Sequence, residues 1–118
     1  MVNIQPLVPA LGAVVDGIDF ANPSDLDFEA LHAALMRYGV VFARDQNLAP
    51  AQQLALAARF GETLLHPAYR VLDGAVSVLE STTERPSKID SWHSDMTFEA
   101  RPPLGSILHA KIIPSAGG

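Results

Sequence analysis

A helical segment with a defined start and a defined end most constrains how this chain can fold. Apolar residues recur at helical spacing between residues 28 and 38 and predict one buried face of an amphipathic helix. These residues are Phe28, Leu31, Leu35 and Tyr38. Ser24 or Asp27 can cap the start of this helix, and Gly39 stands where a left-handed residue would end it.

A second helix is predicted directly after it. Pro50 suits the first turn of a helix, an alanine-rich run continues to Phe60, and Gly61 follows as a stop. No internal repeat and no stretch typical of an interdomain linker separates the two helices from the rest of the chain. The 118 residues therefore predict one small domain or a piece of a larger one.

Shorter apolar segments around the helices predict strands. Period-two spacing in Gly12–Phe20 places Val14, Ile18 and Phe20 on one face. The other predicted strands are Val40–Phe42, the hairpin of Tyr69–Leu72 with Ala75–Glu80 around Asp73-Gly74, and Leu104–Ile113, which ends at Pro114. Two helices at the start of an antiparallel sheet make an α+β pattern.

The composition excludes several classes of site and partner. A chain without cysteine forms no disulfide, zinc finger or iron–sulfur site. Thirteen acidic against eight basic residues give a net charge of −5, which argues against nucleic acid as a partner. The first basic residue is Arg37, and the apolar stretch from Val8 to Val15 is too short to span a bilayer. We expect a cytoplasmic protein without a membrane partner.

A polar segment, Glu80–Asp90, lies between the predicted hairpin and the most informative part of the sequence. It contains Pro86 and has no apolar periodicity, so we expect an irregular loop. Its place just before a candidate metal-binding segment suggests a mobile lid over that site.

Among four histidines, His93 stands out because Asp95 follows two positions later. On an extended strand, residues two apart point to the same face, so both side chains could bind one metal ion. An imidazole, a carboxylate and a third ligand from elsewhere would form a 2-His-1-carboxylate site. For His32 and His109 the sequence favours ordinary boundary or strand positions instead.

A metal-free alternative would use Ser94 as a nucleophile between His93 and Asp95. Adjacent residues of a strand point to opposite faces, so Ser94 could not readily reach both neighbours. The sequence therefore disfavours a hydrolase.

The longer string around His93 resembles the taurine dioxygenase family, whose signature contains W-H-[ST]-D-x-[ST]-F, then P-P and P-x-x-G-G. The matching segments, in colinear order, are Gly39–Phe42, Arg44–Gln46, Arg59–Glu62, His66–Pro67, Ser91–Phe98, Arg101–Pro103 and Ile113–Gly118. The resemblance covers nearly the whole chain. It implies an iron(II)- and 2-oxoglutarate-dependent oxygenase.

The resemblance also implies roles for individual residues. His93 and Asp95 match the first two iron ligands, and His66 and Tyr69 match positions that contact an anionic head group in sulfonate-oxidising members. Ile89 stands where the taurine-type pattern has an asparagine, which suggests an anionic substrate with a larger apolar part than taurine. Trp92 and Phe98 are expected to pack around the metal-binding strand.

The resemblance implies a double-stranded β-helix (jelly-roll) to which residues 1–118 contribute the N-terminal portion, with two flanking helices. The threonine and arginine that contact 2-oxoglutarate, and the second histidine ligand, are expected beyond Gly118. A homo-oligomer is compatible with this assignment.

The implied reaction hydroxylates a small anionic organosulfur substrate, an alkylsulfonate or alkyl sulfate, with O₂ and 2-oxoglutarate; aryloxyalkanoates are a further substrate class. The non-enzyme alternative is a catalytically inactive fragment that serves only as a folding or interaction module.

Overall fold

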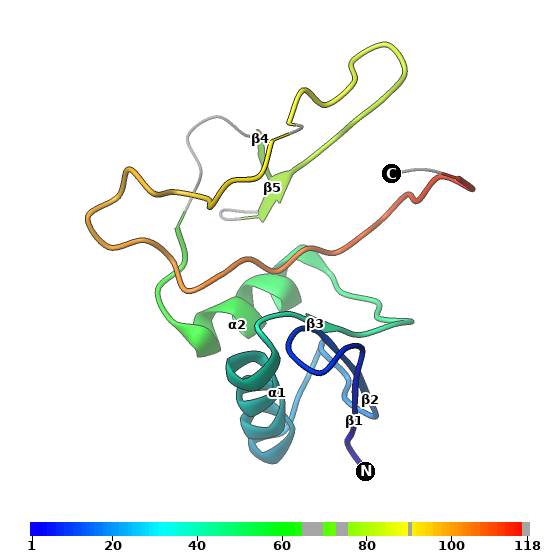
Figure 1. Cartoon of the computed structure of the whole chain (residues 1–118), viewed down its shortest axis with the longest axis vertical. Helices are drawn as coiled ribbons and strands as arrows, with labels where there is room; N and C mark the ends of the chain where they lie inside the picture. The colour runs from blue at the N-terminus through cyan, green and yellow to red at the C-terminus, as the bar shows by residue number, and fades with distance from the viewer. Residues whose placement is uncertain (65–69, 73–75, 90, 117–118) are drawn as a thin grey trace.

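Two regions follow one another along the longest axis of the molecule (Figure 1). The computed structural model describes residues 1–64, 70–72, 76–89 and 91–116. Residues 1–60, called here the N-terminal module, contain both helices and a three-stranded sheet. The remaining residues contain a short hairpin and long irregular segments.

The sheet of the N-terminal module has the order β1-β2-β3. Strand β1 (Asn3–Pro6) pairs antiparallel with β2 (Ala13–Asp16), and β2 pairs parallel with β3 (Val41–Phe42). The sheet is therefore mixed and not antiparallel as predicted, because the chain passes through helix α1 between β2 and β3. Strand β3 is an edge strand, and its Phe42 is 48% exposed.

Helix α1 (Asp25–Tyr38) begins and ends where the sequence predicts. The Ser24 hydroxyl accepts a hydrogen bond from the Asp27 backbone N–H at 3.2 Å, and the Asp27 carboxylate accepts from the Ser24 N–H at 3.2 Å. This capping box satisfies donors that the first turn leaves free. Gly39 ends the helix at φ 73°, and its N–H donates to the Leu35 carbonyl.

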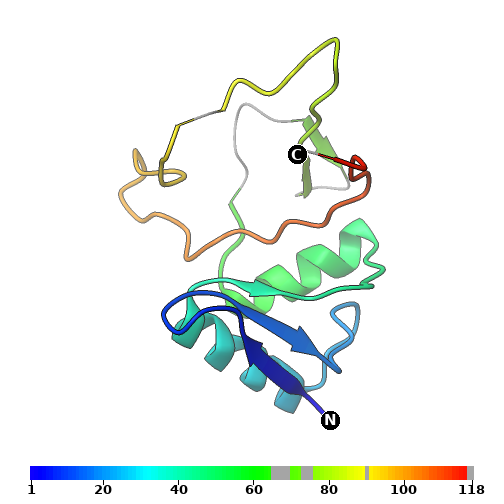
Figure 2. The same cartoon turned by 45° about the vertical axis from the view of Figure 1, so that its right-hand side comes forward.

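Helix α2 (Pro50–Phe60) also has the predicted bounds. Pro50 occupies its first turn, and the Gln52 side chain accepts a hydrogen bond from the Ala49 N–H at 2.9 Å. Figure 2 shows α1 behind the β1–β2 pair and α2 above it. Between the sheet and the helices lies one apolar core, formed by Val15, Ile18, Leu31, Ala34 and Leu56.

The predicted strand Gly12–Phe20 is shorter in the structure, and its buried face is different. Ala13 and Val15 are buried, whereas Val14 is only half-buried. Gly17, at φ 81°, ends the strand, so the period-two pattern does not continue from Val14 to Ile18. A Cβ atom at Gly17 would also clash with the Met1 backbone, so no other residue fits there without a shift of the chain.

The second region contains the predicted hairpin, β4 (Arg70–Leu72) and β5 (Val76–Val78), which pair antiparallel. Its turn, around Asp73-Gly74, lies outside the described residues. Residues 80–89 form an exposed loop with local hydrogen bonds, such as that from the Ser87 N–H to the Ser81 hydroxyl at 3.0 Å. That this loop is a mobile lid stays a prediction.

The predicted strand Leu104–Ile113 is wrong as a secondary structure element. Both views show this segment crossing between α2 and the hairpin (Figures 1 and 2). No strand of the described ranges pairs with it, and its ties to the N-terminal module come from side chains instead. A ladder of backbone hydrogen bonds, which defines a strand, is therefore missing here.

No helix in the described ranges is long and apolar enough to cross a bilayer.

Candidate metal centre

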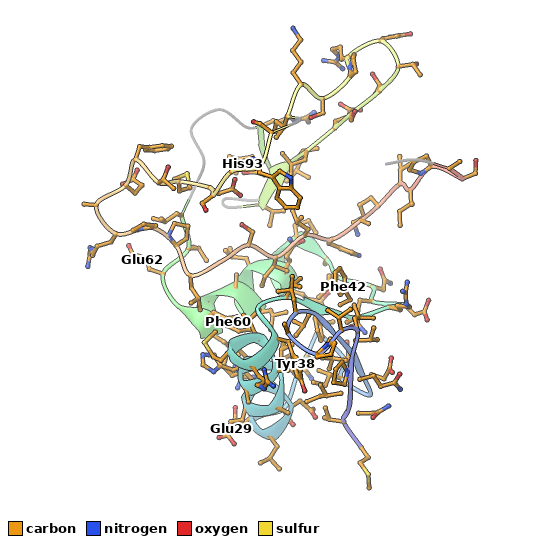
Figure 3. The ribbon with its side chains drawn as sticks, viewed as in Figure 1. Glu29, Tyr38, Phe42, Phe60, Glu62 and His93 are labelled. Atoms are coloured by element: carbon orange, nitrogen blue, oxygen red, sulfur yellow. The ribbon has the colours of Figure 1, made fainter. Side chains whose placement is uncertain are left out.

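The segment that carries His93 and Asp95 is a bend followed by a turn, not the extended strand that the sequence predicts. Met96 adopts φ 56°, and the Glu99 N–H donates to the Met96 carbonyl at 3.0 Å, which closes the turn. The closed turn follows both His93 and Asp95, whose side chains meet without a strand ladder among the described residues. His93 lies in the second region, well away from Tyr38 and Phe60 of the N-terminal module (Figure 3).

The two side chains present one nitrogen and one oxygen to the same point. His93 Nε2 lies 3.0 Å from Asp95 Oδ1. His93 Nδ1 lies 2.8 Å from the Ser91 carbonyl oxygen, which can only accept a hydrogen bond. In the protonated ring, Nδ1–H donates to the Ser91 carbonyl and Nε2–H donates to the Asp95 carboxylate. The neutral ring keeps its proton on Nδ1, which leaves the Nε2 lone pair for a metal.

This donor set fits a divalent transition metal. A neutral imidazole with a carboxylate suits iron, manganese or zinc, and each bond would be about 2.0–2.2 Å long. Two donor atoms 3.0 Å apart can both bind one ion at such distances. Without a metal, the hydrogen bond to the Ser91 carbonyl raises the pKa of His93 above its ordinary 6.5, and the Asp95 carboxylate contributes to this rise.

Among the described residues, the structure places no third protein ligand beside this pair. In the part of the chain that the structure describes, no group of three histidine, aspartate or glutamate side chains could hold a metal. His109 lies elsewhere, with its Nε2 3.2 Å from the Gln46 carbonyl oxygen. His32 is half-buried and packs beside Phe28 and Phe60, which agrees with the boundary position predicted for it.

Two hollows flank the pair. One of about 420 Å³ lies on the His93 side and is lined by Ile89, Ser91, Trp92 and His93. Ile89 is 61% exposed and Trp92 is fully exposed, so both add apolar surface to the hollow that His93 lines. The packing predicted for Trp92 and Phe98 is wrong, because Phe98 is also 69% exposed and no strand surrounds the pair.

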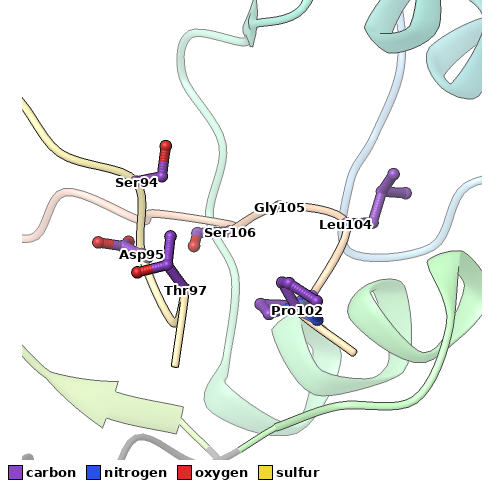
Figure 4. A pocket seen from close by; sticks show the side chains of 8 residues that line it. Ser94, Asp95, Thr97, Pro102, Leu104, Gly105 and Ser106 are labelled. Carbon is purple, nitrogen blue, oxygen red and sulfur yellow. The ribbon is translucent and has the colours of Figure 1, made fainter. Parts of the chain in front are cut away.

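The other hollow, of about 470 Å³, lies on the Asp95 side. Ser94, Asp95 and Thr97 line one wall, and residues 102–106 line the other (Figure 4). The sequence names Pro102 and Pro103 only as part of the family motif and gives Gly105 and Ser106 no role. The proline pair, which favours extended backbone before each proline, is the one local signal in this stretch.

The remaining predicted site residues have different outcomes. His66 and Tyr69 lie outside the described residues, so their contact with a substrate stays a prediction. Ser94 lines the Asp95-side hollow, but no hydrogen bond joins it to His93 or Asp95 among the described residues. His93 Nε2 faces Asp95 instead, so the arrangement needed for a serine nucleophile is not formed.

Comparison with known proteins gives a consistent result. The family model described as "Taurine catabolism dioxygenase TauD, TfdA family" matches residues 3–118. The alpha-ketoglutarate-dependent sulfate ester dioxygenase of Pseudomonas putida is 34% identical over 98% of this chain and 39% of its own length. The (S)-phenoxypropionate/alpha-ketoglutarate-dioxygenase of Sphingobium herbicidovorans is 35% identical over 98% of this chain and 42% of its own length.

A solved structure agrees with these relatives. A taurine dioxygenase from Burkholderia xenovorans superposes with a TM-score of 0.56 and 37% identity, over 63% of this chain and 27% of that one. The chain thus spans about two fifths of the length of the curated relatives it matches.

Proposed function

Because this chain belongs to the taurine catabolism dioxygenase TauD, TfdA family, we propose that residues 1–118 form the N-terminal portion of a single oxygenase domain. Its activity is the iron(II)- and 2-oxoglutarate-dependent hydroxylation of a small anionic organosulfur compound, an alkyl sulfate or an alkylsulfonate. The observation that carries the proposal is the pair of donor atoms, His93 Nε2 and Asp95 Oδ1, 3.0 Å apart.

The proposed architecture is a jelly-roll in which α1 and α2 flank the metal-bearing part. Similarity to a taurine dioxygenase structure supports this arrangement. In it, the irregular segments of the second region would pair with strands from outside residues 1–118.

In the proposed site, His93 and Asp95 hold iron together with a third ligand from outside the described residues. When bound, iron and 2-oxoglutarate supply the oxidation: one atom of O₂ enters the substrate C–H bond, and the other enters succinate as CO₂ leaves. The Ser91 carbonyl keeps the proton of His93 on Nδ1, so that Nε2 is free to bind the metal. Hydroxylation at the carbon next to the sulfate oxygen or the sulfonate sulfur gives a product that falls apart.

The substrate assignment depends on the polarity around the site. His66 and Tyr69 would donate charge-assisted hydrogen bonds to an anionic head group. Ile89 and Trp92 offer an apolar hollow beside His93, which favours an alkyl tail over the ammonium group of taurine. A site that makes no hydrogen bond to that ammonium loses about 1–3 kcal/mol of binding free energy. This loss corresponds to a preference of roughly 5- to 150-fold for the alkyl substrate over taurine.

An aryloxyalkanoate is the second candidate substrate. The relative from Sphingobium herbicidovorans, which is named a phenoxypropionate dioxygenase, is 35% identical to this chain. An aromatic ring would also suit a hollow lined by Ile89 and Trp92.

Succinate release by the intact gene product tests the proposal. We expect the highest kcat/KM with an alkyl sulfate or a longer alkylsulfonate, a lower value with taurine, and no turnover after Asp95→Ala. Asp16→Ala, an exposed aspartate of the N-terminal module, is the matched control and should keep full turnover.

Taurine as the best substrate would contradict the assignment of Ile89. Turnover only with a phenoxypropionate would favour the second candidate. The 118-residue chain is assayed in parallel, and we expect it to release no succinate by itself. If the intact gene product is inactive as well, the inactive-module alternative is favoured.

A further inference from the structure

Three side chains tie residues 107–111 to the N-terminal module. Gln53 Nε2 donates to the Ile107 carbonyl at 2.9 Å, and Lys111 Nζ donates to the Leu48 carbonyl at 3.1 Å. His109 Nε2 lies 3.2 Å from the Gln46 carbonyl and therefore acts as the donor. We call these three hydrogen bonds the clasp. They join positions more than 50 residues apart in the sequence.

The clasp fixes one face of the segment and leaves the other free. Ile107, between the apolar core and Gln53, packs against the core cluster. Leu108 and Ile112, which alternate with the clasp residues, are 78% and 93% exposed. The alternation indicates that the segment has a definite orientation although it forms no ladder.

The attachment point on the module is itself rigidly held. The Gln46 side chain accepts from the Phe20 N–H at 2.9 Å and donates to the Ile18 carbonyl at 3.2 Å. Ile18 belongs to the buried core. The residue whose carbonyl receives His109 is therefore joined by a side-chain hydrogen bond to a residue of the buried core.

Residues 102–106, which directly precede the clasp, form one wall of the hollow beside Asp95. Ser94, Asp95 and Thr97 form the opposite wall, as Figure 4 shows. From this continuity we propose that Gln53, His109 and Lys111 are positioning residues: the clasp transmits the rigidity of the N-terminal module to the wall that faces Asp95 and sets the width of that hollow. The functional meaning of the hollow rests on the proposed function, because Asp95 is the proposed iron ligand.

A distance across the hollow in the 118-residue chain tests this. The chain has no cysteine, so Thr97→Cys with Ser106→Cys accepts two nitroxide labels at defined positions. Lys111→Met removes a charged donor and keeps the aliphatic stem, Lys111→Arg restores the donor, and Lys88→Met is a matched control in the exposed 80–89 loop.

We expect the label-to-label distance to be narrowly distributed in the parent chain. Loss of one hydrogen bond from a charged donor shifts the balance toward the released segment by about tenfold or more, so Lys111→Met should broaden the distribution. Lys111→Arg should restore it, and Lys88→Met should leave it unchanged. Gln53→Glu, which turns a donor into an acceptor, should broaden it independently.

An unchanged distribution in both Lys111→Met and Gln53→Glu would overturn the proposal. So would broadening that Lys111→Arg does not reverse, or broadening matched by loss of α1 circular dichroism, since that would indicate general unfolding. Cobalt(II) binding, followed through Trp92, separates this result from the proposed function. If the intact gene product binds no cobalt(II) but the clasp variants still broaden the distance, the metal assignment fails and the clasp stands.

Discussion

The N-terminal module and residues 91–116, which contain His93 and Asp95, are held together in different ways. In the module, apolar side chains such as Val15 and Leu31 are only 2% exposed. In the second region, Trp92 is fully exposed, and Leu108 and Ile112 are 78% and 93% exposed. Burial thus holds the first region, and local turns and side-chain hydrogen bonds hold the second. The comparison indicates that stability and chemistry are separable by mutation in this chain.

The largest expected effect is on the stability of the module. Leu31→Ala removes a buried side chain from the core and should lower the free energy of unfolding by about 2–5 kcal/mol. Leu26→Ala, on the exposed face of the same helix, should change it by less than about 0.5 kcal/mol. Urea unfolding followed by circular dichroism measures both.

Trp92→Ala extends this test to the second region. This substitution removes more atoms than Leu31→Ala. We nevertheless expect the free energy of unfolding to fall by less than about 0.5 kcal/mol, because the indole is exposed. A loss comparable to that of Leu31→Ala would mean that the two regions share one core, which would break the comparison.

The next effect is confined to metal binding. Asp95→Asn should weaken cobalt(II) binding at least about tenfold, or about 1.4 kcal/mol, because it removes a charged ligand. Cobalt(II) quenching of Trp92, the only tryptophan, measures this affinity next to His93. The urea midpoint should not move, and Asp16→Asn should leave the affinity intact. Equal affinity in the parent and Asp95→Asn chains would remove Asp95 as a ligand.

Each region contains a serine hydroxyl that accepts a backbone hydrogen bond, Ser24 in the module and Ser81 in the second region. The two serines can therefore be compared by the same substitution. Ser24→Ala removes the cap of α1 and should lower the free energy of unfolding by about 1 kcal/mol. Ser81→Ala removes a similar bond in an exposed loop and should have no measurable effect. Ser24→Asp should keep the cap. Similar losses at positions 24 and 81 would show that the loop contributes to global stability.

The smallest effect is a pH dependence at His93. The pKa of this histidine is raised by its hydrogen bond to the Ser91 carbonyl and by Asp95. The folded, metal-free chain thus gains a little stability that is fully present below pH 6.5 and is lost as the pH rises through the raised pKa. The affinity for cobalt(II) depends on pH in the opposite direction. It increases as the pH rises through the pKa of His93, since protonated His93 cannot bind metal.

Nuclear magnetic resonance titration of His93 measures this pKa directly. We expect a midpoint above 6.5 in the parent chain and a lower one in Asp95→Asn. A midpoint at or below 6.5 in the parent would contradict the hydrogen bond between Nδ1 and Ser91.

The sequence predicts those features that local chemistry decides. Ser24 and Gly39 set the bounds of α1, and Pro50 and Gly61 those of α2, because caps and stops act within one turn. The pairing of His93 with Asp95 was also predicted, but for the wrong reason. The prediction rests on strand alternation, and the structure brings the two side chains together without a strand in the described residues.

Features that depend on distant partners could not be predicted in this way. Strand β1 has only four residues and ends at Pro6, so its pairing with β2 is what makes it a strand. Residues 104–113 have the apolar pattern of a strand but no neighbouring strand in the described ranges. The hollow beside Asp95 likewise needs the clasp, which joins positions 46–53 to positions 107–111.

The core cluster has a consequence for biosynthesis. Its five buried members, from Val15 to Leu56, all belong to the first half of the chain. As a ribosome delivers the polypeptide from its N-terminus, every one of them is available before the segment with His93 and Asp95 is translated. The module can therefore fold first and present Gln46, Leu48 and Gln53 as a finished surface, on which residues 107–111 dock as they emerge.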